Sequence, residues 1–426
     1  MRRRTHGPAV GVKARRVCVL TETFYPDVVD GLTLNAYRLA ERLIARGQDL
    51  FVVTRYMRPG TPAGEIVGTV PIIRIPPRGP LKGIGWRAIG PITYFLARLS
   101  YWLIRHADDY DIVMTHGTNV LPIPLAPLRL IGLRKTWVVR AESPMEVWQE
   151  ISPASAQRMG LSRASPVLRA WRRLRRAVLR RADCVVAISS EIREAFLSVG
   201  IDPEKIRCIP NGIDTVKFAP APPEQKPLSR RELGLPVDKV LVTYTGRLAA
   251  AKGLLPLIRV WRELVSRHPS AHLVLVGSGG EHTVDNCESE LRQFIATHGL
   301  EPAVSLPGQV DNVAEYLRAS DLFVLPSEYE GLSLSLLEAL ACGLPAVATR
   351  VGAAPEVLEH ERSGILIEPK DPPALERGIE WLLNHRERWP AMAAAARQTV
   401  LQNYSLDAVC NAYVRLFQDL RPGDSG

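Results

Sequence analysis

Short apolar runs recur along the chain, and longer stretches of mixed apolar and polar residues separate them. Runs rich in Val, Ile and Leu that alternate with helix-length segments are typical of parallel strands joined by helices. In the first half this pattern predicts strands at residues 17–20, 50–53, 72–75, 112–115, 137–140, 184–188 and 207–209. In the second half it predicts strands at residues 240–246, 272–277, 304–308, 322–326, 345–349 and 364–369. The fold class is therefore α/β.

A proline-rich segment, FAPAPPEQKP at residues 218–227, interrupts the alternation. A chain of 426 residues is also too long for one ordinary hydrophobic core. We expect two doubly wound, Rossmann-like domains that face each other across a cleft, at residues 16–217 and 237–395, with a linker at 218–236. Residues 1–15 are expected to form a disordered basic tail. In open sheets of this type, ligands bind beyond the carboxyl ends of the strands.

The composition, with 46% apolar and 23% charged residues, is that of a soluble globular protein. No stretch reaches the roughly 18 uninterrupted apolar residues that a membrane-spanning helix needs. The N-terminal segment lacks the apolar core of a signal peptide, so we expect a cytoplasmic protein. The six cysteines are far apart, with no histidine at metal-ligand spacing, and predict neither a zinc site nor a disulfide framework.

The basic excess of the chain is confined to its first half. Residues 1–214 contain 33 Lys and Arg against 18 Asp and Glu, whereas the remaining residues contain 21 against 26. A basic half favours contact with an acidic surface or ligand. A GC-rich genome, which favours Arg over Lys, would produce the same bias without any function, and both interpretations stay open.

Two cations follow the predicted strand at 240–246. The segment GRLAAAKG places Gly246 at the strand end, with Arg247 and Lys252 five residues apart. The planar fork of an arginine and the point charge of a lysine together suit a diphosphate, and they would neutralise charge on a departing nucleotide. Cations after a strand are also common at solvated surfaces, so this pattern alone leaves both interpretations open.

The segment PSEYEGLSLSLLEALACGLPAVA, at residues 326–348, combines two carboxylates with a helix start. Glu330 and Glu338 are eight residues apart, and the run LSLLEALACG predicts a helix that ends at a glycine. Free N–H groups at its N-terminus would form an anion site. They belong to Gly331, Leu332, Ser333 and Leu334. Glu330 could accept hydrogen bonds from sugar hydroxyls and Glu338 from ribose hydroxyls, although glutamates in helices are also often solvated or favour the helix dipole.

These segments, in this order and at this spacing, resemble the family-4 retaining glycosyltransferases of GT-B fold, the glycosyl transferases group 1. The resemblance covers nearly all of residues 16–421 and is strongest over 182–369. The matching segments are CIPNGIDTVKF (208–218), TGRLAAAKG (245–253), VLVGSG (274–279), LPGQVDNVAEYLRASDLFVLPS (306–327), EGLSLSLLEALACGLPAVAT (330–349) and VGAAPEVLEHERSGILIEP (351–369).

The resemblance implies a role for each of these residues. Arg247 and Lys252 would hold the diphosphate of a nucleotide-sugar donor, and Glu338 would hold its ribose. Glu330 and the backbone after it would hold the transferred sugar. The base would lie beside Gln309 and Val310.

The resemblance also extends to both ends of the chain. TETFYPDVVDGLTLNAYRLAERLIARGQDL (21–50) is similar to the family's glycine turn and first helix, with Gly31 as the residue that approaches the donor phosphates. Members often have two glycines there, where this chain has Asp30 and Gly31. The closing pattern YSLDAVCNAYVRLFQDL (404–420) resembles the terminal helix, which would cross back onto the first domain within residues 396–421.

One position departs from the family more seriously. After the strand TWVVR, many members place a histidine near the transferred sugar, whereas this chain has Glu142. A carboxylate there could stabilise an oxocarbenium-like charge or act as a nucleophile. It could equally bind an acceptor hydroxyl or pair with Arg140 as a structural group. His116, at the end of the strand IVMTH, is a further candidate lining residue.

Two other patterns compete with these interpretations. Asp109-Tyr110-Asp111 has the spelling of a metal-binding DxD motif, but it precedes a strand, and Arg247 and Lys252 already supply positive charge for a diphosphate. We therefore expect no metal ion and no other cofactor. Residues 158–181 contain nine arginines and no acid, and Val167, Trp171, Leu174 and Val178 form one helical stripe. Such a helix could contact an anionic membrane or pack on the sheet.

The function expected from the sequence is transfer of a sugar, with retention of configuration, from a nucleotide diphosphate to a lipid-linked, glycan or small-molecule acceptor. The basic half favours a lipid-linked or acidic acceptor and peripheral contact with the inner face of a membrane. Two alternatives are a nucleotide-sugar epimerase of the same fold and a nucleotide-sugar-binding protein that has altered or lost catalysis. No aromatic-interleaved basic stripe supports nucleic-acid binding.

Overall fold

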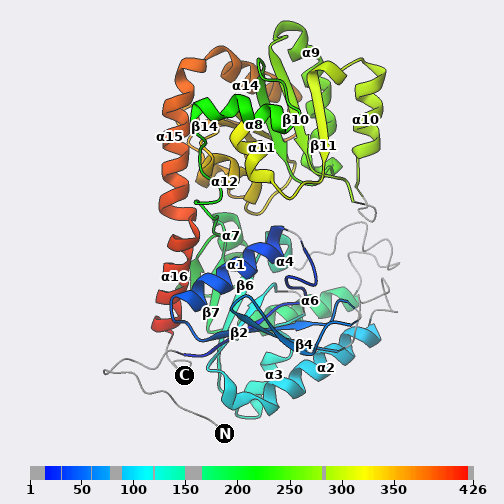
Figure 1. Cartoon of the computed structure of the whole chain (residues 1–426). Helices are drawn as coiled ribbons and strands as arrows, with labels where there is room; N and C mark the ends of the chain where they lie inside the picture. The colour runs from blue at the N-terminus through cyan, green and yellow to red at the C-terminus, as the bar shows by residue number, and fades with distance from the viewer. Residues whose placement is uncertain are drawn as a thin grey trace. The chain divides into compact units, whose positions relative to one another are not determined.

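A computed structural model describes residues 15–29, 31–58, 60–76, 89–118, 120–148, 166–280 and 285–420 (Figure 1). The chain divides into two compact units. Unit 1 contains the chain up to Ala187, residues 195–207 and the chain from Cys410 onward. Unit 2 contains Ile188–Glu194 and Cys208–Val409. The expected basic tail lies outside the described residues except for Arg15.

Unit 1 is built on an eight-stranded sheet of order β3-β4-β2-β1-β5-β6-β7-β8. Its strands are β1 (Val17–Leu20), β2 (Leu50–Arg55), β3 (Gly64–Val67), β4 (Val70–Ile75), β5 (Ile112–His116), β6 (Thr136–Ala141), β7 (Cys184–Ala187) and β8 (Ile206–Cys208). The pairs from β4 to β7 are parallel, whereas β3 is antiparallel to β4. All seven predicted strands are confirmed. The sequence pattern missed β3 because this edge strand is partly exposed and lacks an apolar run.

The helices of unit 1 connect these strands. They are α1 (Gly31–Ala45), α2 (Ile89–Arg105), α3 (Leu125–Leu130), α4 (Pro144–Trp148) and α6 (Pro166–Leu179), with short 3₁₀ turns η2 (Ala107–Asp109) and η3 (Pro203–Lys205). Two further helices, α7 (Ser190–Ser198) and α16 (Leu406–Asp419), have residues in both units. Helices α2 and α3 contact each other beside the sheet (Figure 1). The central strands β1, β2, β5, β6 and β7 are buried almost throughout, as expected for a parallel sheet covered on both faces.

Unit 2 has a six-stranded parallel sheet of order β11-β10-β9-β12-β13-β14. The strands are β9 (Val240–Thr245), β10 (Ala271–Val276), β11 (Val304–Gly308), β12 (Leu322–Leu325), β13 (Ala346–Thr349) and β14 (Gly364–Ile367). All six predicted strands are confirmed to within two residues at each end. Two parallel α/β units of this kind are the Rossmann-like domains of the GT-B class, and a cleft between them stays a prediction.

The helices of unit 2 are α8 (Lys226–Glu232), α9 (Leu254–Arg267), α10 (Glu288–Thr297), α11 (Val313–Ala319), α12 (Leu334–Ala341), α13 (Ala354–Val357), α14 (Pro372–Asn384) and α15 (Trp389–Thr399). Shorter 3₁₀ turns are η4 (Pro223–Gln225), η5 (Ala250–Lys252), η6 (Glu301–Ala303) and η7 (Arg386–Arg388). A π-helical turn, η8 (Val400–Tyr404), joins α15 to α16.

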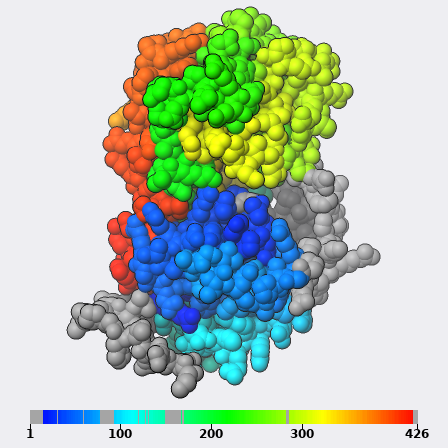
Figure 2. Space-filling view, viewed as in Figure 1, coloured from blue at the N-terminus to red at the C-terminus, as the bar shows by residue number. Residues whose placement is uncertain are grey.

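Part of the range expected as a linker is packed structure. Residues 226–232 form α8, which packs beside α11, and their surfaces lie next to each other in Figure 2. The buried Arg230 donates from Nε to the carbonyl of Ala319 at 2.9 Å and pairs with Asp321 at 2.6 Å. Leu235 belongs to a core cluster with strands β9 and β10. The proline-rich composition misled this part of the prediction, because proline is well tolerated in the first turn of a helix.

Candidate functional site

Three glycines lie side by side where β9, β10 and β11 end. Gly246, Gly277 and Gly308 have φ angles of 147°, 139° and 81°. The N–H of Gly277 donates to the carbonyl of Gly308 at 2.9 Å. The N–H of Gly246 donates to the carbonyl of Val276 at 3.0 Å. A Cβ on Gly277 would lie only 1.8 Å from the carbonyl oxygen of Gly246. This edge of the sheet is therefore bare backbone, which a ligand can approach closely.

The loop after Gly246 carries the two predicted cations. The Tyr244 hydroxyl donates to the carbonyl of Arg247 at 2.9 Å, and burial raises the pKa of Tyr244, which keeps it a donor. The Arg247 side chain is exposed and has no hydrogen-bond or ion-pair partner among the described residues. Lys252 closes η5 and is followed by Gly253, whose φ is 68°. A Cβ on Gly253 would lie 2.0 Å from the carbonyl oxygen of Pro326, so this loop is held tightly against the end of β12.

Lys252 and Glu330, which are 78 residues apart in the sequence, form an ion pair. The Nζ of Lys252 lies 2.7 Å from Oε1 of Glu330, and their side chains are 20% and 13% exposed. The hydroxyl of the buried Ser327 donates to the same carboxylate oxygen at 2.7 Å. The lysine is thus held at one place while two of its three donors stay available to a ligand.

The backbone around Glu330 is fixed from a second direction. The N–H of Ala353 donates to the carbonyl of Gly331 at 2.8 Å. Gly352 has a φ of 51°, and a Cβ there would lie 2.2 Å from the oxygen of Gly331 and 2.6 Å from that of Glu330. Gly352, Ala353 and Ser327 all lie in segments that resemble the family, but no local pattern predicted a role for them.

The N-terminus of α12 follows directly. Ser333 is its N-cap and accepts from the N–H of Leu336 at 3.3 Å. The N–H groups of Leu332, Ser333 and Leu334 donate to no described residue. They stay available for an anion at the positive end of the helix dipole. Glu338 lies half-buried on the same helix, between Leu337 and Ala339 in the sequence.

The two residues expected beside the base differ in their surroundings. The side chain of Gln309 is exposed and accepts from the Ser278 hydroxyl at 3.3 Å. Val310 is half-buried and packs on the core cluster of Val274, Val276 and Tyr316. The side chain of Val310 is therefore engaged in the core, which leaves its backbone as the part that can contact a ligand.

Comparison with known proteins gives two family matches. Residues 225–399 match the family model described as glycosyl transferases group 1, and residues 29–217 match the model described as glycosyltransferase family 4. A lipopolysaccharide core biosynthesis mannosyltransferase of Rhizobium meliloti is 31% identical over 57% of this chain and 67% of its own length. The chain belongs to the group 1 glycosyltransferases.

Other matches span almost the whole of this glycosyltransferase. A D-inositol 3-phosphate glycosyltransferase of Corynebacterium jeikeium is 26% identical over 93% of this chain and 94% of its own length. The structure of Anabaena HepE in complex with UDP has a TM-score of 0.73 and 20% identity, covering 95% of this chain and all of that one. A further structure of the same Anabaena protein contains UDP-glucose. These matches show the fold of both units.

Unit 1 of the glycosyltransferase places Glu142 just beyond the end of β6. Its Oε1 lies 3.0 Å from Nε of Arg140, whose side chain is only 2% exposed. Of the roles left open for Glu142, pairing with Arg140 is therefore present. His116 ends the neighbouring strand β5. Burial and then the charge of Arg140 hold its pKa well below the usual value, and its Nε2 has no partner among the described residues.

Further charged groups join Glu142 at this edge, and sequence analysis missed them. Burial is the main cause of each shift in pKa: it raises that of Glu22, raises that of Glu146 to about 7 and lowers that of Arg175 to about 10. The second cause for Glu146 is the charge of Glu142. Arg175 also donates to the carbonyl of Thr118 at 2.8 Å. No motif signals these residues, because separate elements bring them together.

The remaining predicted features of unit 1 have structural explanations. Gly31 is exposed and begins α1. In Asp109-Tyr110-Asp111, Asp111 accepts from the N–H of Arg16 at 2.9 Å, and the buried Tyr110 donates to the carbonyl of Leu103 at 2.8 Å. No group of three His, Cys, Asp or Glu side chains within the described ranges could hold a metal ion. Independence from metal stays a prediction.

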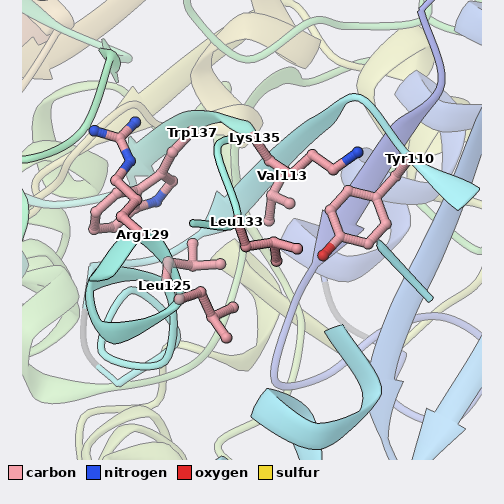
Figure 3. A pocket seen from close by; sticks show the side chains of 8 residues that line it. Tyr110, Val113, Leu125, Arg129, Leu133, Lys135 and Trp137 are labelled. Carbon is pink, nitrogen blue, oxygen red and sulfur yellow. The ribbon is translucent and has the colours of Figure 1, made fainter. Parts of the chain in front are cut away.

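A small apolar pocket of unit 1 lies away from these residues (Figure 3). Tyr110 and Val113 line it from the amino end of β5, and Lys135 and Trp137 from the start of β6. His116 and Glu142 lie at the opposite ends of the same two strands. The pocket is therefore not part of the candidate site.

The arginine-rich stripe expected at residues 158–181 is only partly described, from Pro166 onward. Of its apolar members, Val178 is buried, whereas Trp171 and Leu174 are 37% and 50% exposed. The described part of the stripe is therefore buried at Val178 and exposed at Trp171 and Leu174. No helix in the described part of the chain is long and apolar enough to cross a membrane. A cytoplasmic location stays a prediction.

Proposed function

We propose that this glycosyltransferase moves a sugar from a nucleotide diphosphate to an acceptor hydroxyl, with retention of the anomeric configuration. The observation that carries the proposal is the Lys252–Glu330 ion pair, held beside the N-terminus of α12 and the glycine-lined strand ends of unit 2. This arrangement combines a fixed cation, free N–H groups and a carboxylate, which are the groups that a sugar diphosphate requires.

Each group would act on a different part of the donor. Arg247 and Lys252 bind the diphosphate and stabilise the charge that develops as it leaves. Glu330, together with the backbone from Gly331, accepts hydrogen bonds from the transferred sugar. Glu338 binds the ribose. The Anabaena structures with UDP and UDP-glucose support this choice of donor class.

The acceptor would bind at the carboxyl edge of the unit 1 sheet. Glu142 lies at this edge, and ligands of open α/β sheets bind there. The printed names of two relatives refer to D-inositol 3-phosphate and to the lipopolysaccharide core. Together with the basic excess of the first half, these names favour an acidic or lipid-linked acceptor.

We also propose peripheral contact of unit 1 with anionic membranes. Helix α6 exposes Trp171 and Leu174 beside several arginines and has no acidic residue. Aromatic and aliphatic groups that alternate with cations are typical of helices at a membrane interface. The protein should co-float with vesicles containing phosphatidylglycerol and not with phosphatidylcholine alone, and Trp171→Ser with Leu174→Ser should reduce this binding. Equal flotation with both vesicle types would refute the contact.

Thermal unfolding with UDP, GDP, ADP and their glucose conjugates, in EDTA, tests the donor site. A nucleotide at 100 times its dissociation constant should stabilise the protein by about 2.7 kcal/mol. One base should give this shift in the wild type, and Lys252→Ala should reduce it strongly. A shift in EDTA also shows that donor binding needs no metal.

Lys205→Ala is the matched control. Lys205 is a lysine of unit 1 that lies on η3, and its Nζ donates to backbone carbonyls. This variant should keep the full nucleotide-induced shift. If no nucleotide shifts the unfolding curve, with EDTA or with added Mg²⁺, the proposed donor site is wrong.

A further inference from the structure

Two glutamates lie together beyond the end of β6. Glu142 follows the strand, and Glu146 is four residues later on the short helix α4. The N–H of Glu142 donates to Oε2 of Glu146 at 3.4 Å. The N–H of Glu146 in turn donates to the Ser143 hydroxyl at 3.3 Å. The loop therefore closes on itself through the Glu146 side chain.

A second connection ties this loop to the end of β5. The Thr118 hydroxyl donates to the carbonyl of Glu146 at 2.8 Å, and the carbonyl of Thr118 accepts from Arg175 at 2.8 Å. Arg175 is almost fully buried and comes from α6. Glu146 thus lies half-buried where β5, β6 and α6 meet.

Charged groups face this position from each neighbouring element. Glu142 and Arg140 lie at the end of β6, and Arg175 lies on α6. Glu22 follows β1, and its charge interacts with that of Arg175. His116, at the end of β5, is held neutral. Arg140 pairs with Glu142 at 3.0 Å, so the structure provides Glu142 with a direct counter-charge. No ion pair of that kind reaches Glu146 among the described residues.

We propose that Glu146 is a positioning residue for Glu142: its carboxyl group, in the neutral acid form, holds the 142–146 loop so that the Glu142 carboxylate meets the acceptor hydroxyl. This inference rests on the proposed function, because it assigns Glu142 to the acceptor. The charge of Glu142 disfavours a second ionised carboxylate at Glu146, and only Glu142 forms a direct ion pair with Arg140. The proton therefore belongs on Glu146.

The proposal makes acceptor binding depend on pH. Burial, followed by the charge of Glu142, raises the pKa of Glu146 to about 7. The acid form of Glu146 is therefore dominant at pH 6 and scarce at pH 8. If only this form positions Glu142, the competent fraction falls about tenfold over that interval, and the KM for the acceptor rises by the same factor. The maximal rate kcat changes much less.

The first test follows the side chains directly, in full-length protein labelled with ¹³C at the glutamate carboxyl carbons. The Glu146 signal, assigned by its loss in Glu146→Gln, should titrate near pH 7. The Glu142 signal should move in the same pH range and stop moving in Glu146→Gln, since glutamine copies the neutral acid. In Glu142→Gln the Glu146 signal should titrate at lower pH. A Glu142 signal that ignores Glu146 would overturn the proposal.

The second test measures turnover with UDP-glucose as donor and D-inositol 3-phosphate as the probe acceptor. The wild type should show the tenfold rise in acceptor KM between pH 6 and pH 8, and Glu146→Gln should not. If Glu146 only stabilised the fold, Glu146→Gln would change the stability of the protein but would not abolish a pH dependence confined to the acceptor KM. If this acceptor is not used while UDP still stabilises the protein, only the acceptor choice fails, and the carboxyl titration still decides the role of Glu146.

Discussion

The two sheets of this glycosyltransferase present opposite kinds of surface at their carboxyl edges. In unit 2 the edge is backbone: Gly246, Gly277 and Gly308 all have positive φ angles, and a Cβ on Gly277 would collide with the carbonyl oxygen of Gly246. In unit 1 the corresponding edge is made of charged side chains, among them the buried Arg140 and the half-buried Glu142 and Glu146. The difference separates two ways of building a ligand site.

A sheet edge built of backbone tolerates few substitutions. A glycine at positive φ cannot be replaced where the added Cβ would lie closer than 3 Å to a backbone atom. Such a site suits a ligand part that is common to many donors, namely the diphosphate. A side-chain edge can be changed one residue at a time. It suits the partner that varies, namely the acceptor.

The largest expected effect tests the backbone edge. Gly277→Ala would put a Cβ 1.8 Å from the carbonyl oxygen of Gly246 at a φ of 139°, so unfolding free energy should fall by about 3 kcal/mol or more. Gly299→Ala is the control, since Gly299 has a φ of 63° but open space around it, and it should cost about 1 kcal/mol. Urea denaturation measures both. Equal losses would show that the strand ends of unit 2 are not tightly packed.

The next effect tests the charged edge of unit 1. The pKa of Glu146 rises from 4.5 to about 7 on folding, so the folded state binds more protons than the unfolded state between these values. Stability is therefore lost as pH rises from 4.5 to 7. Glu146→Gln should be more stable than the wild type by about 3 kcal/mol at pH 8 and equal to it below pH 4.5, in denaturant titrations.

Glu288 of unit 2 provides a control of opposite sign. The N–H of Gly279 and then Arg292 hold the pKa of Glu288 below its usual value. Glu288→Gln should therefore be less stable than the wild type at pH 7, and the difference should vanish as the pH falls below the pKa of this group. If both variants respond to pH in the same direction, the assignment of the Glu146 proton is wrong.

A smaller effect tests how Glu330 is held. Ser327→Ala removes the second hydrogen bond to the carboxylate that pairs with Lys252, so nucleotide-sugar affinity should fall about fivefold to tenfold. Isothermal titration measures it, with the glucose conjugate of whichever nucleotide stabilises the protein in thermal unfolding. Ser266→Ala, an exposed serine of α9 with a local hydrogen bond, should leave affinity unchanged. An unchanged affinity in Ser327→Ala would show that Lys252 alone fixes Glu330.

The smallest expected effect concerns recognition of the nucleotide base of the donor. Gln309→Ala removes an exposed side chain that contacts Ser278 at 3.3 Å, and the binding free energy should change by about 0.5 kcal/mol or less. The ratio of UDP to ADP affinity should stay the same. A tenfold change in this ratio would mean that Gln309 reads the base, and that unit 2 also depends on a side chain.

This contrast explains what could be predicted from the sequence. The candidate site of unit 2 lies in short contiguous segments such as GRLAAAKG and EGLSLSLLEAL, so its residues could be proposed from the sequence, and their role in donor binding stays a prediction. The contact between Lys252 and Glu330 was not foreseen, because it depends on the packing of η5 against the end of β12. Glu146 and Arg175 gave no signal at all, since burial and neighbouring charges shift their pKa values and neither cause is visible in a local pattern.

The bounds of the strands and helices also differ in how well the sequence predicts them. The predicted strand at 240–246 ends one residue early because Gly246 turns the chain at a φ of 147°. The polar edge strand β3 and the helix α8 were missed because composition favoured a loop in both places. Buried apolar runs are read reliably from sequence, and elements that depend on a neighbour for their stability are not.

The division of the chain has a consequence for how the protein is made. Unit 1 includes the residues from Cys410 onward, and the ring of Tyr413 lies 6.0 Å from the guanidinium of the buried Arg140. On the ribosome, the nascent unit 1 therefore lacks this partner until almost the whole polypeptide has been synthesised. Unit 2 ends at Val409, so all of its residues have been synthesised before unit 1 is complete. A stop codon shortly before Cys410 would thus damage the first half of the enzyme more than the second.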